Sequence, residues 1–276
     1  MGQLACAGSN ADRSRALEQH QSFKFNQEQI TTLDALARRT KVNTRSTPSR
    51  RLYLQIADQL RTLIYEPDFA VNGRLPPERT LAEQLGVSRP SIREALVALQ
   101  LEGRVEIRMG SGVYLCDVPP SSKEAAQDNV EMGDSLIDIM GARAILEGAI
   151  AASVAPLAKP KDVKALRAIY QTMERECQAG QIPIAADRAF HVRIAQMSNN
   201  EVLTRTVGAL YDERQSPMSS KLLGLYEPVD TWFVALDEHR EILEAIEARD
   251  PIQAQAAMQR HLKTSLKRTM ARRDHA

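Results

Sequence analysis

Four side chains of the kinds that bind transition metals lie in the last third of the chain: Asp187, His191, His239 and His261. Three of the chain's five histidines belong to this set. Asp187 and His191 are four residues apart, so on a helix they share one face. His239 and His261 are equally distant from residue 250, where the Asp250-Pro251 pair interrupts the helical pattern, so an antiparallel helix pair would bring both imidazoles to one level. Three imidazoles and one carboxylate are a suitable ligand set for a divalent metal.

A second group of residues, in the first half of the chain, has the chemistry of nucleic-acid contact. Ser88 begins a predicted helix directly after Gly86 ends another, which is the pattern of a helix-turn-helix. The first residues of the second helix then meet base edges, and arginine offers a planar donor fork that matches guanine. A glycine-rich turn after that helix exposes backbone amides to phosphate. The candidate DNA-contacting residues are Arg79, Ser88, Arg89, Ser91, Arg93 and Gly110.

Taken alone, these arginines could be no more than a solvated helix face. The surrounding elements favour the other interpretation. Apolar residues recur at helical spacing from Leu52 to Ile64, and further helices are predicted up to Leu85 and from Ser88 to Leu101. Two short alternating segments around residues 109–112 then predict a β-hairpin. Residues 51–116 are therefore predicted to form a winged helix-turn-helix domain in which Arg89 and Arg93, one turn apart, both face the groove.

The rest of the chain divides into three further parts. Residues 1–50 are polar, carry eight basic against four acidic residues, and are expected to be a basic extension. A Pro-Pro-Ser-Ser stretch places a linker at residues 117–133. Residues 134–272 are predicted to form an all-α antiparallel bundle, so that the fold is mainly α. Its six predicted helices cover residues 134–155, 160–179, 183–198, 200–217, 230–248 and 251–272.

Composition sets limits on the class of protein. The length of 276 residues suits two domains, and 43% hydrophobic with 26% charged residues is ordinary for a soluble protein. The net charge of +1 gives no indication of nucleic-acid binding. Three scattered cysteines do not form a disulfide framework, and we find neither a signal peptide nor an apolar run of membrane length. We therefore expect a cytoplasmic protein without a membrane partner.

The segment from Leu75 to Leu115 resembles the winged-helix domain of GntR-family bacterial transcription regulators at almost every position. Residues from about 125 to 272 resemble the FCD effector domain of the FadR subfamily, in its six-helix VanR-like form. The motifs that carry this second resemblance are Arg143–Glu147, Asp187–His191, Ser198–Asn200, Glu238–Arg240 and Gln259–Leu262. The resemblance implies a DNA-binding regulator, not an enzyme, whose four-residue cluster holds zinc or nickel.

The same resemblance implies how such a protein would work. It would act as a homodimeric repressor or activator on a near-palindromic DNA operator, with a small carboxylate effector bound at the metal. The candidate effector-binding residues are Arg143, Asn199 and Arg214. Two alternatives remain open: Arg143 could only form a salt bridge with Glu147, and Asn199 could be only a helix-cap or turn residue. Four aromatic side chains are expected inside the bundle: Tyr211, Tyr226, Trp232 and Phe233. Of these, Trp232 is expected near the pocket.

Three other functions remain open at this point. The metal could itself be the signal, in which case its removal alone would change DNA affinity. The metal could be purely structural. A metal-dependent enzyme would need a general acid or base beside the open metal position. Glu238 is adjacent to His239, but on a helix it is expected to point elsewhere.

Overall fold

The computed structural model describes residues 52–66, 69–116, 132–227 and 230–270. They fall into two compact units, with the division near residue 131. The predicted extension at residues 1–50 and all but the last two residues of the predicted linker lie outside the described residues.

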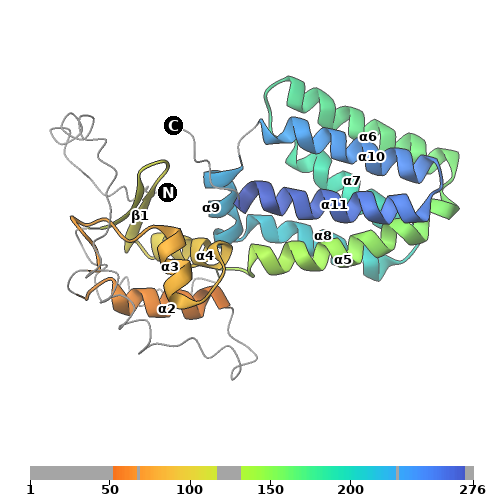
Figure 1. Cartoon of the computed structure of the whole chain (residues 1–276). Helices are drawn as coiled ribbons and strands as arrows, with labels where there is room; N and C mark the ends of the chain where they lie inside the picture. The colour runs from red at the N-terminus through yellow and green to blue at the C-terminus, as the bar shows by residue number, and fades with distance from the viewer. Residues whose placement is uncertain (1–51, 67–68, 117–131, 228–229, 271–276) are drawn as a thin grey trace. The chain divides into compact units, whose positions relative to one another are not determined.

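The N-terminal unit is a winged helix-turn-helix, as predicted (Figure 1). Leu60, Ile92 and Leu96 are completely or almost completely buried where α2 and α4 pack together. The hairpin is antiparallel, with Val105 opposite Leu115. Its elements are α2 (Leu52–Leu63), α3 (Glu78–Leu85), α4 (Arg89–Leu101), β1 (Val105–Arg108) and β2 (Gly112–Leu115).

The start of α4 is determined by local sequence. Gly86 ends α3 in the left-handed region, with φ of 65°, which glycine adopts without a steric penalty. Ser88 then caps α4, because its side chain accepts a hydrogen bond from the backbone N–H of Ser91. Pro90 stands in the first turn, where its missing N–H leaves no helical bond unmade. These local interactions place Arg89 at the N-terminal end of α4, the second helix of the helix-turn-helix.

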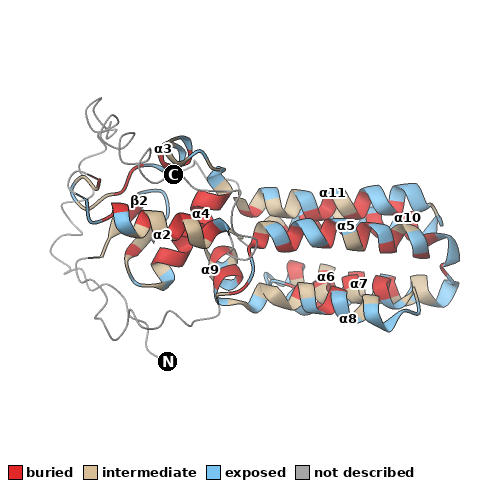
Figure 2. Cartoon of the chain, turned by 90° about the horizontal axis from the view of Figure 1, so that it is seen from below, coloured by how far each residue is buried: buried red, intermediate tan, exposed pale blue. Residues whose placement is uncertain are grey.

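The C-terminal unit is a helical bundle in which α5 and α11 lie side by side in both views (Figures 1 and 2). Small residues permit this close approach: a Cβ atom on Gly148 would lie 2.7 Å from Cγ of Gln259. The chain turns at Asp250 between α10 and α11. The helices are α5 (Leu136–Val154), α6 (Pro160–Gln178), α7 (Ile184–Gln196), α8 (Glu201–Asp212), α9 (Pro217–Tyr226), α10 (Thr231–Glu247) and α11 (Pro251–Met270).

The prediction of six helices was one short for the described part of this unit. The sequence pattern predicts one helix that ends at residue 217 and another that begins at residue 230, whereas α9 begins at Pro217 and lies between them. Proline is well tolerated at the first helical position, and Ser216 caps the helix at Ser219 N. Met218 and Leu222 are fully buried and attach α9 to the bundle. No helix among the described residues is long and apolar enough to cross a bilayer.

The cap of α4 can be tested without DNA. Ser88→Ala removes the acceptor for Ser91 N and should lower the stability of the N-terminal unit by about 1 kcal/mol. Amide hydrogen exchange in α4 measures this loss. Ser88→Asp retains a capping oxygen and should exchange like the wild type. Equal exchange in Ser88→Ala would show that the cap contributes nothing.

Candidate metal centre and DNA-contacting surface

The four predicted metal-binding side chains come together inside the bundle from α7, α10 and α11. One potential ligand atom from each lies within 4.8 Å of those of the other three. The imidazole centroids of His239 and His261 are 4.2 Å apart, which agrees with the predicted symmetry about residue 250. All four residues are buried, and Asp187 is only 5% exposed. The structure therefore forms the cluster that the spacing predicted.

Each of the three histidines forms a hydrogen bond through its Nδ1 atom. The pairs are His191 Nδ1 with Glu147 Oε2 (2.5 Å), His239 Nδ1 with Ala235 O (2.7 Å), and His261 Nδ1 with Glu238 Oε2 (2.9 Å). A carbonyl or an ionised carboxylate can only accept, so each Nδ1 must carry the hydrogen. The lone pair of each neutral imidazole is then on Nε2. Such partners set the tautomer and ring orientation of histidine ligands.

One carboxylate oxygen of Asp187 accepts a hydrogen bond, and the other does not. Tyr211 donates its hydroxyl hydrogen to Asp187 Oδ2 at 2.5 Å. Asp187 Oδ1 lies 2.8 Å from His239 Nε2. Neither of these atoms has a hydrogen-bond partner among the described residues, and His191 Nε2 also has none. Buried polar atoms without partners are unfavourable. Three such atoms converging on one point fit a cation there, so the donor set passes this test for a divalent metal.

Electrostatics keep both carboxylates of this site ionised. Burial raises the pKa of Asp187, but His191 and His239 outweigh burial and lower it well below its usual value. Burial likewise raises the pKa of Glu147, and the opposing effects of Arg143 and His191 bring it to about 2. The pKa of His261 falls to about 3 because of burial and the neighbouring His239. At neutral pH the site therefore holds ionised carboxylates and a neutral His261.

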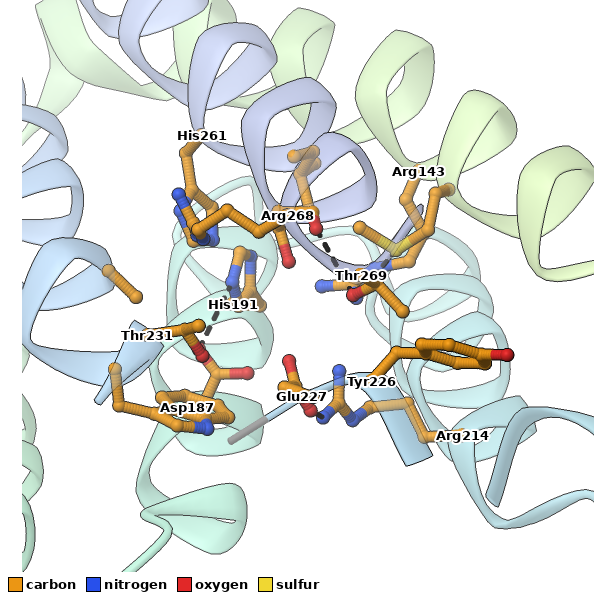
Figure 3. A pocket seen from close by; sticks show the side chains of 15 residues that line it. Arg143, Asp187, His191, Arg214, Tyr226, Glu227, Thr231, His261, Arg268 and Thr269 are labelled. Atoms are coloured by element: carbon orange, nitrogen blue, oxygen red, sulfur yellow. Dashed lines mark hydrogen bonds and ion pairs between the residues drawn. The ribbon is translucent and has the colours of Figure 1, made fainter. Parts of the chain in front are cut away.

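A pocket adjoins the cluster, and Arg143 lines it (Figure 3). The Arg143 Nε atom donates to Glu147 Oε1 at 2.7 Å, so the predicted alternative of a salt bridge is present. Its Nη2 atom is buried and has no hydrogen-bond partner among the described residues. The guanidinium carbon also lies 4.8 Å from the ring centroid of Tyr211. One arm of Arg143 thus positions Glu147, and the other remains available to an anion.

The other two candidate effector residues have different positions. Arg214 lines the same pocket and pairs with Glu227 at 2.7 Å. Asn199 is an exposed turn residue between α7 and α8 with φ of 52°, and it is not part of the pocket lining. The structure therefore supports the turn alternative for Asn199. Phe233 is 48% exposed, so its predicted place inside the bundle was wrong, whereas Trp232 is buried and lines the pocket.

Sequence reasoning missed three residues that hold the cluster. The sequence indicates Glu147 only as a partner of Arg143 and Tyr211 only as a core residue. It predicts that Glu238 points away from the face of His239. That direction brings it to His261 on the next helix, where it also pairs with Arg268. The sequence did contain a signal for the two glutamates. Glu147 shares a motif with Arg143, and Glu238 directly precedes the candidate ligand His239.

The predicted DNA-contacting residues separate into exposed and buried groups. Arg89 and Gly110 are exposed, and so is Arg79, which is 76% exposed and pairs with Glu83 on its own helix. Ser88 is exposed and occupied with the cap, and Ser91 is buried.

The expectation that Arg93 faces outward beside Arg89 is wrong for this structure. Arg93 is only 1% exposed, and its Nη2 atom lies 2.6 Å from Glu78 Oε2 at the start of α3. The partly exposed carboxylate of Glu78 compensates for the burial of the Arg93 charge. A contact between Arg93 and DNA would first require this ion pair to open.

Comparisons with known proteins agree with both units. Residues 52–115 match the model described as "Bacterial regulatory proteins, gntR family", and residues 138–264 match the FCD domain. The Exu regulon transcriptional regulator of Escherichia coli K12 is 33% identical over 224 residues, which are 79% of this chain and 84% of that protein. The Uxu operon transcriptional regulator of the same strain is 32% identical, covering 82% and 89%. The Uxu operon regulator of Haemophilus influenzae is 32% identical, covering 77% and 79%.

The chain is therefore a transcription regulator of the GntR family that combines a gntR-type winged helix with an FCD domain. This combination is that of FadR-like regulators, as the sequence motifs predicted. Proteins of this family bind DNA, and the winged helix is the part that does so.

The orienting role of Glu147 can be tested through metal affinity. Glu147→Gln removes the charge behind His191 and should weaken zinc binding by about 10-fold or more, as is typical when such partners are lost. Competition with a fluorescent zinc indicator measures the affinity. Glu241→Gln is the matched control, because Glu241 is an exposed acid on α10 paired with Arg260. Unchanged zinc affinity in Glu147→Gln would exclude the orienting role.

Proposed function

We propose that this GntR-family regulator holds a divalent metal, zinc in the first place and nickel as the alternative, at Asp187, His191, His239 and His261. A small organic acid bound at the metal would then control its affinity for operator DNA in the cytoplasm. The observation that carries the proposal is the convergence of unpartnered buried atoms from Asp187, His191 and His239. Four protein ligands leave room for further ligands when a metal takes five or six.

The residues of this chain would share the binding of the acid. The metal would supply a Lewis-acidic position for a carboxylate oxygen. Arg143 would donate from its unpaired Nη2 atom, while its bond to Glu147 keeps the guanidinium in place. Tyr211 would hold Asp187 through Oδ2 and leave Oδ1 for the metal. Arg214 would contact the acid at the other part of the pocket.

We further propose that two copies of the chain bind a near-palindromic operator. In a two-fold symmetric dimer each winged helix would occupy one half-site, with Arg89 at the base edges and Gly110 at the backbone. The acid can act only through different affinities for the DNA-competent and DNA-incompetent states. A coupling of roughly 1–3 kcal/mol is usual for such a switch.

A second candidate is that the metal itself is the signal. One observation favours it: the pocket beside the cluster has an open volume of only about 20 Å³, room for little more than one water molecule. This alternative requires that chelation alone changes operator affinity and that organic acids have no effect.

The groove assignment predicts the effect of Arg89→Ala. Loss of one bidentate base contact should weaken specific DNA binding by about 1–3 kcal/mol. Fluorescence anisotropy with an operator selected from a random DNA library measures the change. Arg167→Ala, an exposed arginine on α6, is the control. Operator affinity that is the same in Arg89→Ala and the control would refute the assignment.

The metal assignment predicts the effect of His191→Ala. The variant should lose bound metal and the response of DNA binding to organic acids together, because both depend on the same site. Elemental analysis of the purified protein and DNA titrations with and without acid give the two measurements. Gln196→Ala, an exposed residue on the same helix, should change neither. Full metal occupancy in His191→Ala would rule out His191 as an essential ligand.

A further inference from the structure

The pocket already contains a carboxylate that belongs to the chain itself. Glu227 lines the pocket and accepts a hydrogen bond from Arg214 Nη2 at 2.7 Å. The two side chains are only 12% and 9% exposed, so this ion pair is largely but not fully buried. In Figure 3 the Glu227 side chain points toward Arg214 within the pocket. A residue of the chain thus occupies the position at Arg214 that an acidic ligand would need.

The surroundings of Arg214 fit an anion-binding position. Its guanidinium carbon lies 5.7 Å from the ring centroid of Tyr211 and 5.9 Å from that of Trp232, so aromatic rings flank it. Its Nε atom is buried without a hydrogen-bond partner among the described residues. Arg214 therefore has donor capacity that Glu227 leaves unused. A guanidinium with two neighbouring donors in one plane suits a bidentate carboxylate.

Glu227 is also held in an electrostatically unfavourable place. It is the C-terminal cap of α9, where its backbone N–H bonds to Leu223 O. The C-terminus of a helix carries a partial negative charge, which disfavours a carboxylate there. The ion pair with Arg214 offsets this effect. A ligand carboxylate without this disadvantage is therefore able to compete for Arg214.

We propose that Glu227 is an internal competitor that occupies Arg214 and lowers the affinity of the pocket for acids with a second anionic group. The proposal rests on the proposed function, in which the pocket takes an acid. An acid with one carboxylate can bind at the metal and leave the pair intact. An acid with two carboxylates can give the second to Arg214, so that the arginine is not left buried and unpaired when Glu227 is displaced.

The chain carries its own reporter for this exchange. Trp232 is the single tryptophan of the chain and lies beside Arg214. Its fluorescence is recorded while the full-length, zinc-loaded protein is titrated with malonate, succinate and glutarate. Zinc content is measured after each titration, so that removal of the metal by the acid is detected.

Glu227→Gln should tighten binding of the best dicarboxylate roughly tenfold, as expected if Glu227 leaves Arg214 in about one molecule in ten. The Arg214→Gln background should abolish this gain, because nothing remains to compete for. Glu241→Gln, which breaks an exposed arginine–glutamate pair on α10, should behave like the wild type. Thermal unfolding of each variant verifies that it is folded.

The outcomes separate the two proposals. If a dicarboxylate binds the wild type, and binds Glu227→Gln with equal or weaker affinity, the competitor role is overturned. The acid-binding function is then unaffected. A gain that persists in the Arg214→Gln background would also overturn it, because the effect would not pass through Arg214. No binding of any of the three dicarboxylates by any folded variant would overturn the competitor role, while an acid with one carboxylate could still bind at the metal.

Discussion

The C-terminal unit depends on one constraint: three imidazoles and a carboxylate are buried together, and three of their polar atoms have no hydrogen-bond partner in the part of the chain that the structure describes. Leaving a buried polar atom unpaired costs about 1–3 kcal/mol. Nothing in the packing of apolar side chains requires these atoms to converge from α7, α10 and α11. The Nδ1 atoms of all three rings are bonded to partners, so each Nε2 is left as the ring nitrogen that could bind a cation at the centre of the cluster. We regard the cluster as the feature around which the bundle is organised.

The cluster and the pocket form one polar network. Glu147 bonds to Arg143 on its pocket side and to His191 on its cluster side, so the two cannot be positioned independently. Tyr211 has a similar double role, because its hydroxyl group holds Asp187 while its ring lies beside both arginines of the pocket. Under the proposed function, an anion that reaches one of these arginines would change the surroundings of a proposed metal ligand through a single intervening side chain.

The winged helix shows why net charge predicts little about DNA binding. Exposure rather than composition decides which arginine can meet a base. Arg89 and Arg93 are one turn apart on α4, yet Arg89 is exposed and Arg93 is buried against Glu78. Burial of a charge is tolerated only with a partner, and α3 supplies that partner from a distance of fifteen residues. The positive charge that this surface presents to DNA therefore depends on which arginines are held in ion pairs, as Arg93 is with Glu78.

The sequence alone determined the class of fold, the winged helix, the boundaries of most helices and the four members of the cluster, because each depends on local spacing: helical periodicity, caps, and a helical turn at residue 250. It did not determine α9, since proline is compatible both with a loop and with the first position of a helix. The tertiary structure alone decided the partners across helices: Glu147 with His191, Glu238 with His261, Glu78 with Arg93 and Glu227 with Arg214. The physical reason is that spacing along one helix fixes the direction of a side chain, whereas a charge is paired by whichever neighbouring helix packs against it.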